Sequence, residues 1–211
     1  MPRISTKNRI LNCAEQLFAR EGFHSTSLRI LTHKAGVNLA AVNYHFGSKE
    51  ALLRAVIERR LVPLNKLRHA RLEDVLQSAA ENQQAPRAQD LLRAFIEPTL
   101  EFRDLSPGAE DFLTLISRSW NDPDPTVRNC FMELVLPMFK FFFASLQQAL
   151  PDLPVGILRI RMQFLAGTMS IIMCRHNNFQ EQPEDSAPPL SREQQLDQLL
   201  KFILAGLEAP Q

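Results

Sequence analysis

Apolar residues recur along most of the chain with the spacing of amphipathic helices. Near the N-terminus they fall at i, i+1, i+4, i+7 and i+8, one face of a helix over about residues 5–20: Ile10, Leu11, Ala14, Leu17 and Phe18. No segment alternates apolar and polar residues for long enough to indicate a β-strand. The pattern predicts an all-α fold of about nine helices.

Two short helices are expected next, each bounded by residues that favour helix ends. Thr26 or Ser27 is suited to begin the second helix, because a side-chain hydroxyl accepts a hydrogen bond from a free backbone N–H. Gly36 is suited to end it, since glycine adopts the left-handed conformation common at helix ends. Asn38 then caps a third helix that ends near Gly47. Two short helices joined by a glycine-containing turn predict a helix-turn-helix.

A longer fourth helix is predicted from Ser48 onward, with Pro63 inside it. A proline within a helix removes one hydrogen bond, so we expect a kink there. The polar stretch that follows predicts a loop at residues 81–88, and the proline-rich, acidic run 177–191 predicts a flexible one. Apolar periodicity predicts five more helices, at about 89–104, 108–121, 124–149, 155–176 and 192–208.

Positive charge is concentrated near the N-terminus, although the whole chain carries only +1. Residues 1–60 hold ten Lys or Arg against four acidic residues, a balance of +6, and the remainder holds 14 basic and 19 acidic residues, a balance of −5. Cation–phosphate contacts and counterion release supply most non-specific affinity for nucleic acid. The distribution favours a nucleic-acid partner, with a basic surface that has no such partner as the alternative.

The cysteines and the absence of long apolar runs indicate the compartment. Cys13, Cys130 and Cys174 are an odd number, lie far apart and form no C-x-x-C pair, which is typical of free or buried thiols in a reducing compartment. The first residues are polar and basic, without an apolar signal-peptide core. No uninterrupted apolar run reaches the roughly 18 residues that cross a bilayer. We therefore expect a cytoplasmic protein without a membrane partner.

Three segments of the N-terminal region resemble the signature of TetR-family repressors. They are Thr26-Ser27-Leu28-Arg29-Ile30, Lys34-Ala35-Gly36-Val37 and Val42-Asn43-Tyr44-His45-Phe46-Gly47-Ser48-Lys49-Glu50-Ala51-Leu52-Leu53. The resemblance implies a three-helix DNA-binding domain over residues 1–50 and a helical ligand-binding and dimerisation domain over residues 51–211. The segment 36–46 is also similar to the reading helix of family members that respond to fatty acids or their thioesters.

The resemblance also implies which residues contact DNA. In a helix-turn-helix the second helix enters the major groove, so one face should read base edges: Asn38, Ala40, Ala41 and Asn43. Asparagine suits bidentate contact with adenine, and an alanine methyl can meet a thymine methyl. Phosphate contacts are expected from Thr26, Ser27, Tyr44, His45 and Lys49. Val37, Val42 and Phe46 should face the core of the small N-terminal domain.

Several of these residues have a purely structural alternative. Thr26, Ser27 and Asn38 are also suited to cap helices without touching DNA, and a lone His45 is more often structural or solvated. Tyr44, the only tyrosine in the chain, is the strongest phosphate-contact candidate because it lies at the end of the reading helix.

Large soft side chains are concentrated in the C-terminal two thirds, where most of the fourteen phenylalanines and five of the six methionines lie. A helical bundle needs such a core in any case, but the resemblance implies an effector cavity lined by part of it: Phe95, Phe102, Phe112, Trp120, Met132, Phe139 and Met162. A long acyl chain suits such a lining, since each buried methylene contributes about 0.8 kcal/mol. Arg118, Arg128 and Arg175 are alternative partners for a head group.

The last two predicted helices carry more apolar surface than one side of a bundle needs. We expect this surface to form a two-fold, four-helix homodimer interface with these residues: Ile160, Phe164, Gly167, Leu196, Leu200 and Ile203. A dimer matches a palindromic operator on double-stranded DNA, whose half-sites lie about 34–36 Å apart.

An enzyme and a protein–protein adaptor are the rival interpretations. The chain lacks the common nucleotide-binding, zinc-protease and hydrolase motifs, and its five histidines are dispersed, so no catalysis, metal or cofactor is predicted. The sequence favours a repressor released from its operator by a hydrophobic effector such as a fatty acid or acyl-CoA. The alternatives are a repressor of an efflux or catabolic operon that responds to a drug-like or aromatic ligand, and a helical adaptor without DNA binding.

Overall fold

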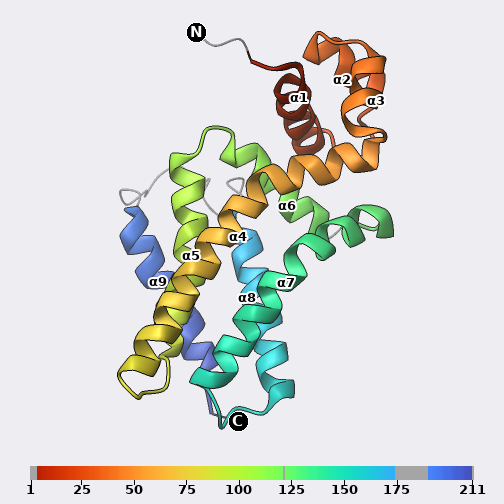
Figure 1. Cartoon of the computed structure of the whole chain (residues 1–211). Helices are drawn as coiled ribbons and strands as arrows, with labels where there is room; N and C mark the ends of the chain where they lie inside the picture. The colour runs from red at the N-terminus through yellow and green to blue at the C-terminus, as the bar shows by residue number, and fades with distance from the viewer. Residues whose placement is uncertain (1–3, 121, 174–189, 211) are drawn as a thin grey trace, which may run out of the picture. The chain divides into compact units, whose positions relative to one another are not determined.

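The computed structural model describes residues 4–120, 122–173 and 190–210. All regular secondary structure within these residues is helical (Figure 1): α1 (Thr6–Arg20), α2 (Leu28–Ala35), α3 (Leu39–Phe46), α4 (Lys49–Glu81), α5 (Ala88–Leu105), α6 (Ala109–Trp120), α7 (Pro125–Ala149), α8 (Val155–Met173) and α9 (Arg192–Leu207). The all-α prediction with about nine helices is confirmed. Cys174, Arg175 and most of the predicted loop 177–191 lie outside the described residues.

The helices begin and end at the residues that favour helix ends. Ser5, Ser27 and Asn38 each accept a hydrogen bond from the backbone N–H three residues later, which satisfies a donor that has no partner within the helix. Ser191 forms a capping box with Gln194 at the start of α9. These local bonds explain why predicted and observed helix boundaries agree to within a few residues.

The chain forms two compact units. Unit 1 comprises the residues up to Pro63 together with Pro107–Val135, and unit 2 comprises Leu64–Ser106 together with the residues from Leu136 onward. Helices α4 and α7 therefore each contribute to both units. Each passage between units lies within two residues of a proline, at Pro63, Pro107 and Pro137. α4 runs through Pro63 as one helix.

Unit 1 is built around the apolar face of α1. Its core contains side chains from α1, α2, α3 and the first turns of α4: Ile10, Leu11, Ala14, Leu17, Phe18, Leu31, Val42, Leu52, Leu53, Val56 and Ile57. Helix α6 also packs against α1. Because α2 and α3 are only eight residues long, packing on α1 rather than intrinsic helix propensity keeps them folded.

A buried carboxylate joins α1 to α4 within unit 1. Glu15 is only 3% exposed, and it accepts hydrogen bonds from Arg59 Nη2 at 2.9 Å and from Arg60 at 3.2 Å (Nε) and 3.0 Å (Nη2). Arg60 also donates to the Pro107 carbonyl at 2.9 Å. One ionic cluster therefore holds α1, α4 and the segment before α6 together.

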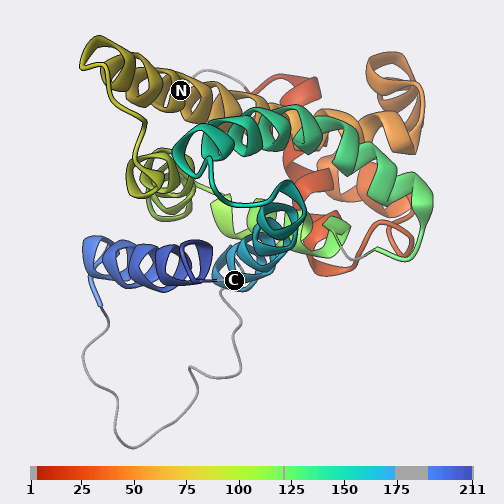
Figure 2. The same ribbon diagram turned by 90° about the horizontal axis from the view of Figure 1, so that it is seen from below.

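Unit 2 has a second apolar core, formed by α5, α8, α9 and the C-terminal parts of α4 and α7. Phe95 and Phe142 stack at its centre with ring centroids 4.1 Å apart, and Phe139 meets Phe95 edge-on at 5.5 Å. Figure 2 shows α9 beside α8. Within this core, Leu196 and Leu200 of α9 are almost completely buried.

Helices α7 and α8 are long and apolar enough to cross a membrane by length and composition, over Pro125–Ala149 and Val155–Ile172. Their buried side chains, including Phe142, Leu158 and Leu165, belong to the core of unit 2. Core helices of helical bundles meet the same criterion, and this packing accounts for the buried part of the apolar surface of each helix.

Candidate nucleic-acid interface

The turn between α2 and α3 is fixed by α1. Gly36 has φ 62° and ends α2 in the left-handed conformation, which a residue with a Cβ adopts at a cost. The Arg9 guanidinium donates to the Ala35 carbonyl (2.7 Å from Nη2) and to the Gly36 carbonyl. A Cβ at Gly36 would lie 3.0 Å from Arg9 Nη2, so glycine also provides the space for this contact. Arg9 therefore sets the angle at which α3 leaves the turn.

The outer face of α3 is polar and accessible. Asn38, Ala40, Asn43 and Tyr44 are exposed, whereas Val42 is buried. A second group is half-buried: Val37, Ala41, His45 and Phe46. Tyr44 is 85% exposed, which is unusual for an aromatic residue on a well-packed unit. Of the four residues predicted to read bases, Asn38, Ala40 and Asn43 are exposed and Ala41 is half-buried.

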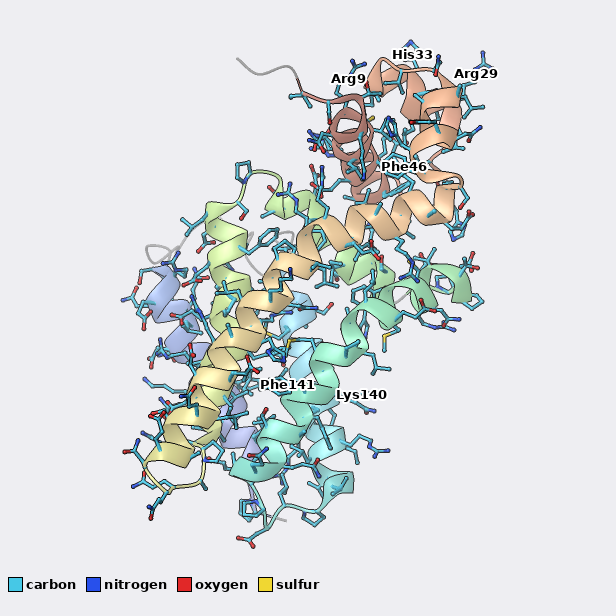
Figure 3. All side chains as sticks on the ribbon, viewed as in Figure 1. Arg9, Arg29, His33, Phe46, Lys140 and Phe141 are labelled. Carbon is cyan, nitrogen blue, oxygen red and sulfur yellow. The ribbon has the colours of Figure 1, made fainter. Side chains whose placement is uncertain are left out.

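Arg29 and Lys34 of α2 add positive charge to this unit. Arg29, His33 and Lys34 are all exposed, and Figure 3 shows Arg29 and His33 pointing outward from α2. Arg29 and Lys34 contribute to the positive charge of residues 1–60, but no sequence motif assigned them to the site. Exposed cations on the first helix of the motif are suited to phosphate contact, because that helix crosses the DNA backbone.

At the start of α4, the side chains of Ser48, Lys49 and Glu50 already make contacts within the protein. The Lys49 ammonium lies 4.3 Å from the centre of the Phe23 ring, and partial burial lowers the pKa of Lys49 while Glu50 opposes that shift. Ser48 Oγ accepts from the Ala51 N–H at 3.1 Å. Hydrogen bonds from the Glu50 backbone N–H and from Ser48 lower the pKa of the Glu50 carboxyl. The Glu50 and Ala51 N–H groups at this helix start thus already have side-chain acceptors.

The residues with two possible roles are found in capping geometry. Ser27 Oγ accepts from the Ile30 N–H at 3.2 Å, and Asn38 Oδ1 accepts from the Ala41 N–H at 2.9 Å. Both side chains remain exposed. Thr26 is fully buried, and its hydroxyl donates to the Gly22 carbonyl at 2.9 Å. In this geometry Thr26 holds the turn before α2 and presents no hydroxyl to DNA.

Comparison with known proteins places this geometry in a family. Residues 10–56 match the family described as bacterial regulatory proteins, tetR family, and residues 93–206 match that described as Tetracyclin repressor-like, C-terminal domain. The second match alone spans more than half of the chain. The chain belongs to the TetR family of transcriptional regulators. This confirms the resemblance that the N-terminal motif carried.

Curated relatives match over part of their length. The transcriptional regulator UidR of Escherichia coli is 40% identical over 52 residues, 25% of this chain and 26% of its own. The repressor Rv3405c of Mycobacterium tuberculosis is 29% identical over 108 residues, 51% of this chain and 56% of its own. The chain thus spans about a quarter to a half of the length of these relatives.

Solved structures match over nearly the whole chain at low identity. The fatty acid degradation regulator FadR from Bacillus halodurans has a TM-score of 0.70 at 12% identity and covers 99% of both chains. The TetR-family regulator PfmR from Thermus thermophilus has a TM-score of 0.59 at 23% identity, with 95% of this chain and 99% of that chain covered. These likenesses show that the chain has the TetR fold.

The predicted effector-lining residues are divided between the two units. Phe95, Phe139 and Met162 belong to the core of unit 2, and Phe102 lies on α5 in the same unit. The other three predicted residues, Phe112, Trp120 and Met132, belong to unit 1, where the Trp120 ring lies 5.9 Å from that of Phe131. Arg118 and Arg128 are exposed in unit 1 and donate to the carbonyls of Arg20 and Asp122.

The predicted dimer residues separate into an exposed and a buried set. On α8, Ile160 is 47% and Phe164 68% exposed, and Gly167 is exposed as well. On α9, the predicted residues Leu196, Leu200 and Ile203 are buried in the core of unit 2. The large exposed apolar residue of α9 is Phe202, which was not among the predicted dimer residues. Helical periodicity identified the apolar stripe of α9 but not the element that covers it.

Proposed function

We propose that the protein is a homodimeric, DNA-binding repressor that a hydrophobic effector, such as a fatty acid or acyl-CoA, releases from a palindromic operator. The observation that carries the proposal is the outer face of α3, where exposed Asn43 and Tyr44 stand on a helix fixed by Arg9 and Gly36. TetR-family membership supports the same role. Such a regulator acts in the cytoplasm.

DNA reading in this proposal divides between base and backbone contacts. Asn43 reads an adenine through its amide, and Ala40 and Ala41 meet thymine methyl groups. Tyr44, with His45, Lys49 and Ser27, contacts phosphates and fixes the register of α3. The basic residues of α2 add phosphate contacts that carry no sequence information. Asn38 contributes chiefly by capping α3, because its side-chain oxygen already accepts the Ala41 N–H.

Dimerisation uses an exposed apolar stripe on α8. Ile160, Phe164, Gly167 and Ile171 follow at i, i+4, i+7 and i+11, so they share one face, and the three side chains among them are exposed. Phe202 of α9 is 70% exposed. An exposed stripe of this length on a helix is typical of an interface, and Gly167 permits close helix approach. A two-fold dimer also gives the two half-site contacts that a palindrome requires.

Effector binding is proposed for the core of unit 2. Its Phe and Met side chains suit an acyl chain, and the printed name of the structural neighbour FadR refers to fatty acid degradation. Helices α4 and α7 run from unit 2 into unit 1, so a change in unit 2 is transmitted along them. Effector and operator then weaken each other's binding by the same factor, as linkage requires.

The experiment is a fluorescence-anisotropy titration with the duplex that lies upstream of the protein's own gene, repeated over a salt series. We expect affinity at least about 10³-fold above that for an unrelated duplex, and loss of binding when palmitate or palmitoyl-CoA is added. Equal affinity for both duplexes overturns the regulator. Specific binding that neither palmitate nor palmitoyl-CoA changes keeps the regulator and overturns the acyl effector.

A further inference from the structure

Arg68 is a buried cation in the core of unit 2. It lies on α4, is 7% exposed, and its guanidinium carbon lies 4.5 Å from the centre of the Phe95 ring. Burial lowers the pKa of Arg68 to about 10, so the side chain stays charged at neutral pH. Across residues 4–120, 122–173 and 190–210, no carboxylate forms an ion pair with it. Nearby Arg71, by contrast, pairs with Glu97 and Glu101.

The hydrogen bonds of Arg68 leave donors to spare. Nε donates to the Phe95 carbonyl at 3.1 Å, Nη1 to Asn65 Oδ1 at 3.0 Å and Nη2 to Thr99 Oγ1 at 2.6 Å. All three acceptors are neutral. A guanidinium carries five N–H groups, so two remain beyond these three bonds. They belong to the two terminal nitrogens, which together fit the two oxygens of a carboxylate.

A structural role accounts for only part of this arrangement. Pro98 lies inside α5, where it provides no N–H and crowds the preceding turn, so carbonyls near it need other donors. Arg68 supplies one of them, to Phe95. A neutral amide side chain has two N–H donors and would bond at most two of these three oxygens, but it would place no charge in an apolar core. Burying a cation among neutral partners is costly, whereas a bound anion would offset that cost.

The surroundings of Arg68 suit an apolar tail attached to such an anion. The Phe95 ring that covers the guanidinium also stacks on Phe142 and meets Phe139. Met138 and Met162 belong to the same core. Phenylalanine and methionine give an apolar lining, and methionine in particular repacks readily around a ligand.

We propose that Arg68 binds the carboxylate of an apolar acid whose tail lies among Phe95, Phe139 and Phe142. The inference rests on the proposed function and narrows its effector from any hydrophobic molecule to an amphiphilic anion. Arg118 and Arg128, the head-group candidates from the sequence, are exposed in unit 1 and donate to backbone carbonyls. The guanidinium selects the acid, and the aromatic rings accept its tail.

The test compares acids with their matched alcohols on the full-length protein. Isothermal titration would measure decanoate against 1-decanol and 4-hexylbenzoate against 4-hexylbenzyl alcohol, so that aliphatic and aromatic tails are separated. We expect wild type to prefer at least one acid over its alcohol by about 10- to 100-fold, the range of a charge-assisted hydrogen-bond pair. Arg68→Gln should lose that preference and leave alcohol affinity unchanged. Arg71→Gln, an arginine already neutralised by carboxylates, should keep it.

A measurement on wild type alone covers the case in which Arg68→Gln does not fold. For decanoate labelled with ¹³C at the carboxyl, pairing with Arg68 holds the pKa of the bound acid below that of the free acid, and an apolar pocket without a cation raises it. Equal binding of acids and alcohols, no binding of either acid, a raised bound pKa, or a preference that survives in Arg68→Gln overturns the assignment. The same protein preparation is also tested for binding to the duplex upstream of its own gene, and this result shows separately whether the proposed DNA-binding function is correct.

Discussion

Asn43 and Tyr44 are neighbours on α3 with different expected tasks, and substitution separates them. Asn43→Ala should relax preference at one base position by about 1–3 kcal/mol while affinity for unrelated duplexes stays the same. Tyr44→Phe removes only a hydroxyl, so it should weaken binding to all duplexes by about 1 kcal/mol. Anisotropy with a set of single-base operator variants measures both effects. An Asn43→Ala protein with unchanged base preference contradicts the orientation assigned to α3.

Glu15 is the residue on which the assembly of unit 1 most depends. Glu15→Gln would leave Arg59 and Arg60 without their shared carboxylate, and we expect a loss of about 3 kcal/mol in the free energy of unfolding. Glu58→Gln is the matched control, because the Glu58 side chain on α4 is 43% exposed and its contact with Arg54 spans 3.7 Å. Its cost should stay below about 1 kcal/mol. Urea titrations compare the two, and similar losses would show that the Glu15 cluster has no special role.

For single residues, the sequence predicts those contacts that form between residues close together in the chain. Ser27 and Asn38 were identified as possible caps because the donors they satisfy lie three residues away. The burial of Thr26 and the pairing of Glu15 were not predicted. Arg59 lies 44 residues from Glu15, and no local pattern records that they meet. That Arg68 lies among neutral acceptors likewise depends on helix packing and could not be predicted from the sequence.

The start of α7 gives a prediction at the scale of one element. Asp124 precedes α7 and accepts the Thr126 N–H at 2.7 Å, and these hydrogen bonds to Thr126 lower the pKa of its carboxyl. A lowered pKa in the folded state means that the charge stabilises the protein above the unfolded pKa of about 4, an effect lost as pH falls through the folded value. Asp124→Asn should therefore lower Tm slightly at pH 7 and leave it unchanged near pH 2.

The control for that prediction is Asp152→Asn, an exposed aspartate after α7. Its Tm should follow wild type at both pH values. Calorimetry at pH 7, 4 and 2 distinguishes the two variants. An Asp124→Asn deficit that persists at the lowest pH would assign the effect to altered packing rather than to charge.

Apolar periodicity predicts helices well and their partners poorly. It located all nine described helices, since each buries one stripe against the rest of the chain. It also identified stripes on α8 and α9 as candidates for one dimer interface. In the folded chain the α9 stripe faces the core of unit 2, and the exposed stripe belongs to α8. An apolar stripe indicates that one face of a helix is covered, but it does not indicate which element covers that face.

For the whole molecule, the proposed dimer is tested through the exposed stripe of α8. Phe164→Glu places a charge at its centre, so we expect a monomer in sedimentation analysis. Operator affinity should fall by about 100-fold or more because the second half-site contact is lost. Leu105→Glu is the control, since Leu105 is 71% exposed at the end of α5 and is not part of the α8 stripe. A Phe164→Glu protein that remains dimeric would exclude this stripe as the interface.

The organisation into two units was only partly predictable. The helix-turn-helix and the helical C-terminal part follow from local signals, but the joining of Pro107–Val135 to the N-terminal unit does not. That arrangement rests on contacts between α1 and α6, among them the 3.1 Å ion pair between Arg20 and Asp111. The division into residues 1–50 and 51–211 remains a prediction of which residues bind DNA and which bind effector, and its bounds differ from those of the two compact units.

The most direct test of the central claim is selection of bound sequences by the purified protein from a pool of random DNA duplexes. The account predicts enrichment of a two-fold symmetric site with half-sites about one helical turn apart, and a matching loss of enrichment at one position for Asn43→Ala. Recovery of unenriched DNA, or of no DNA at all, would contradict a dimeric regulator that reads DNA through α3.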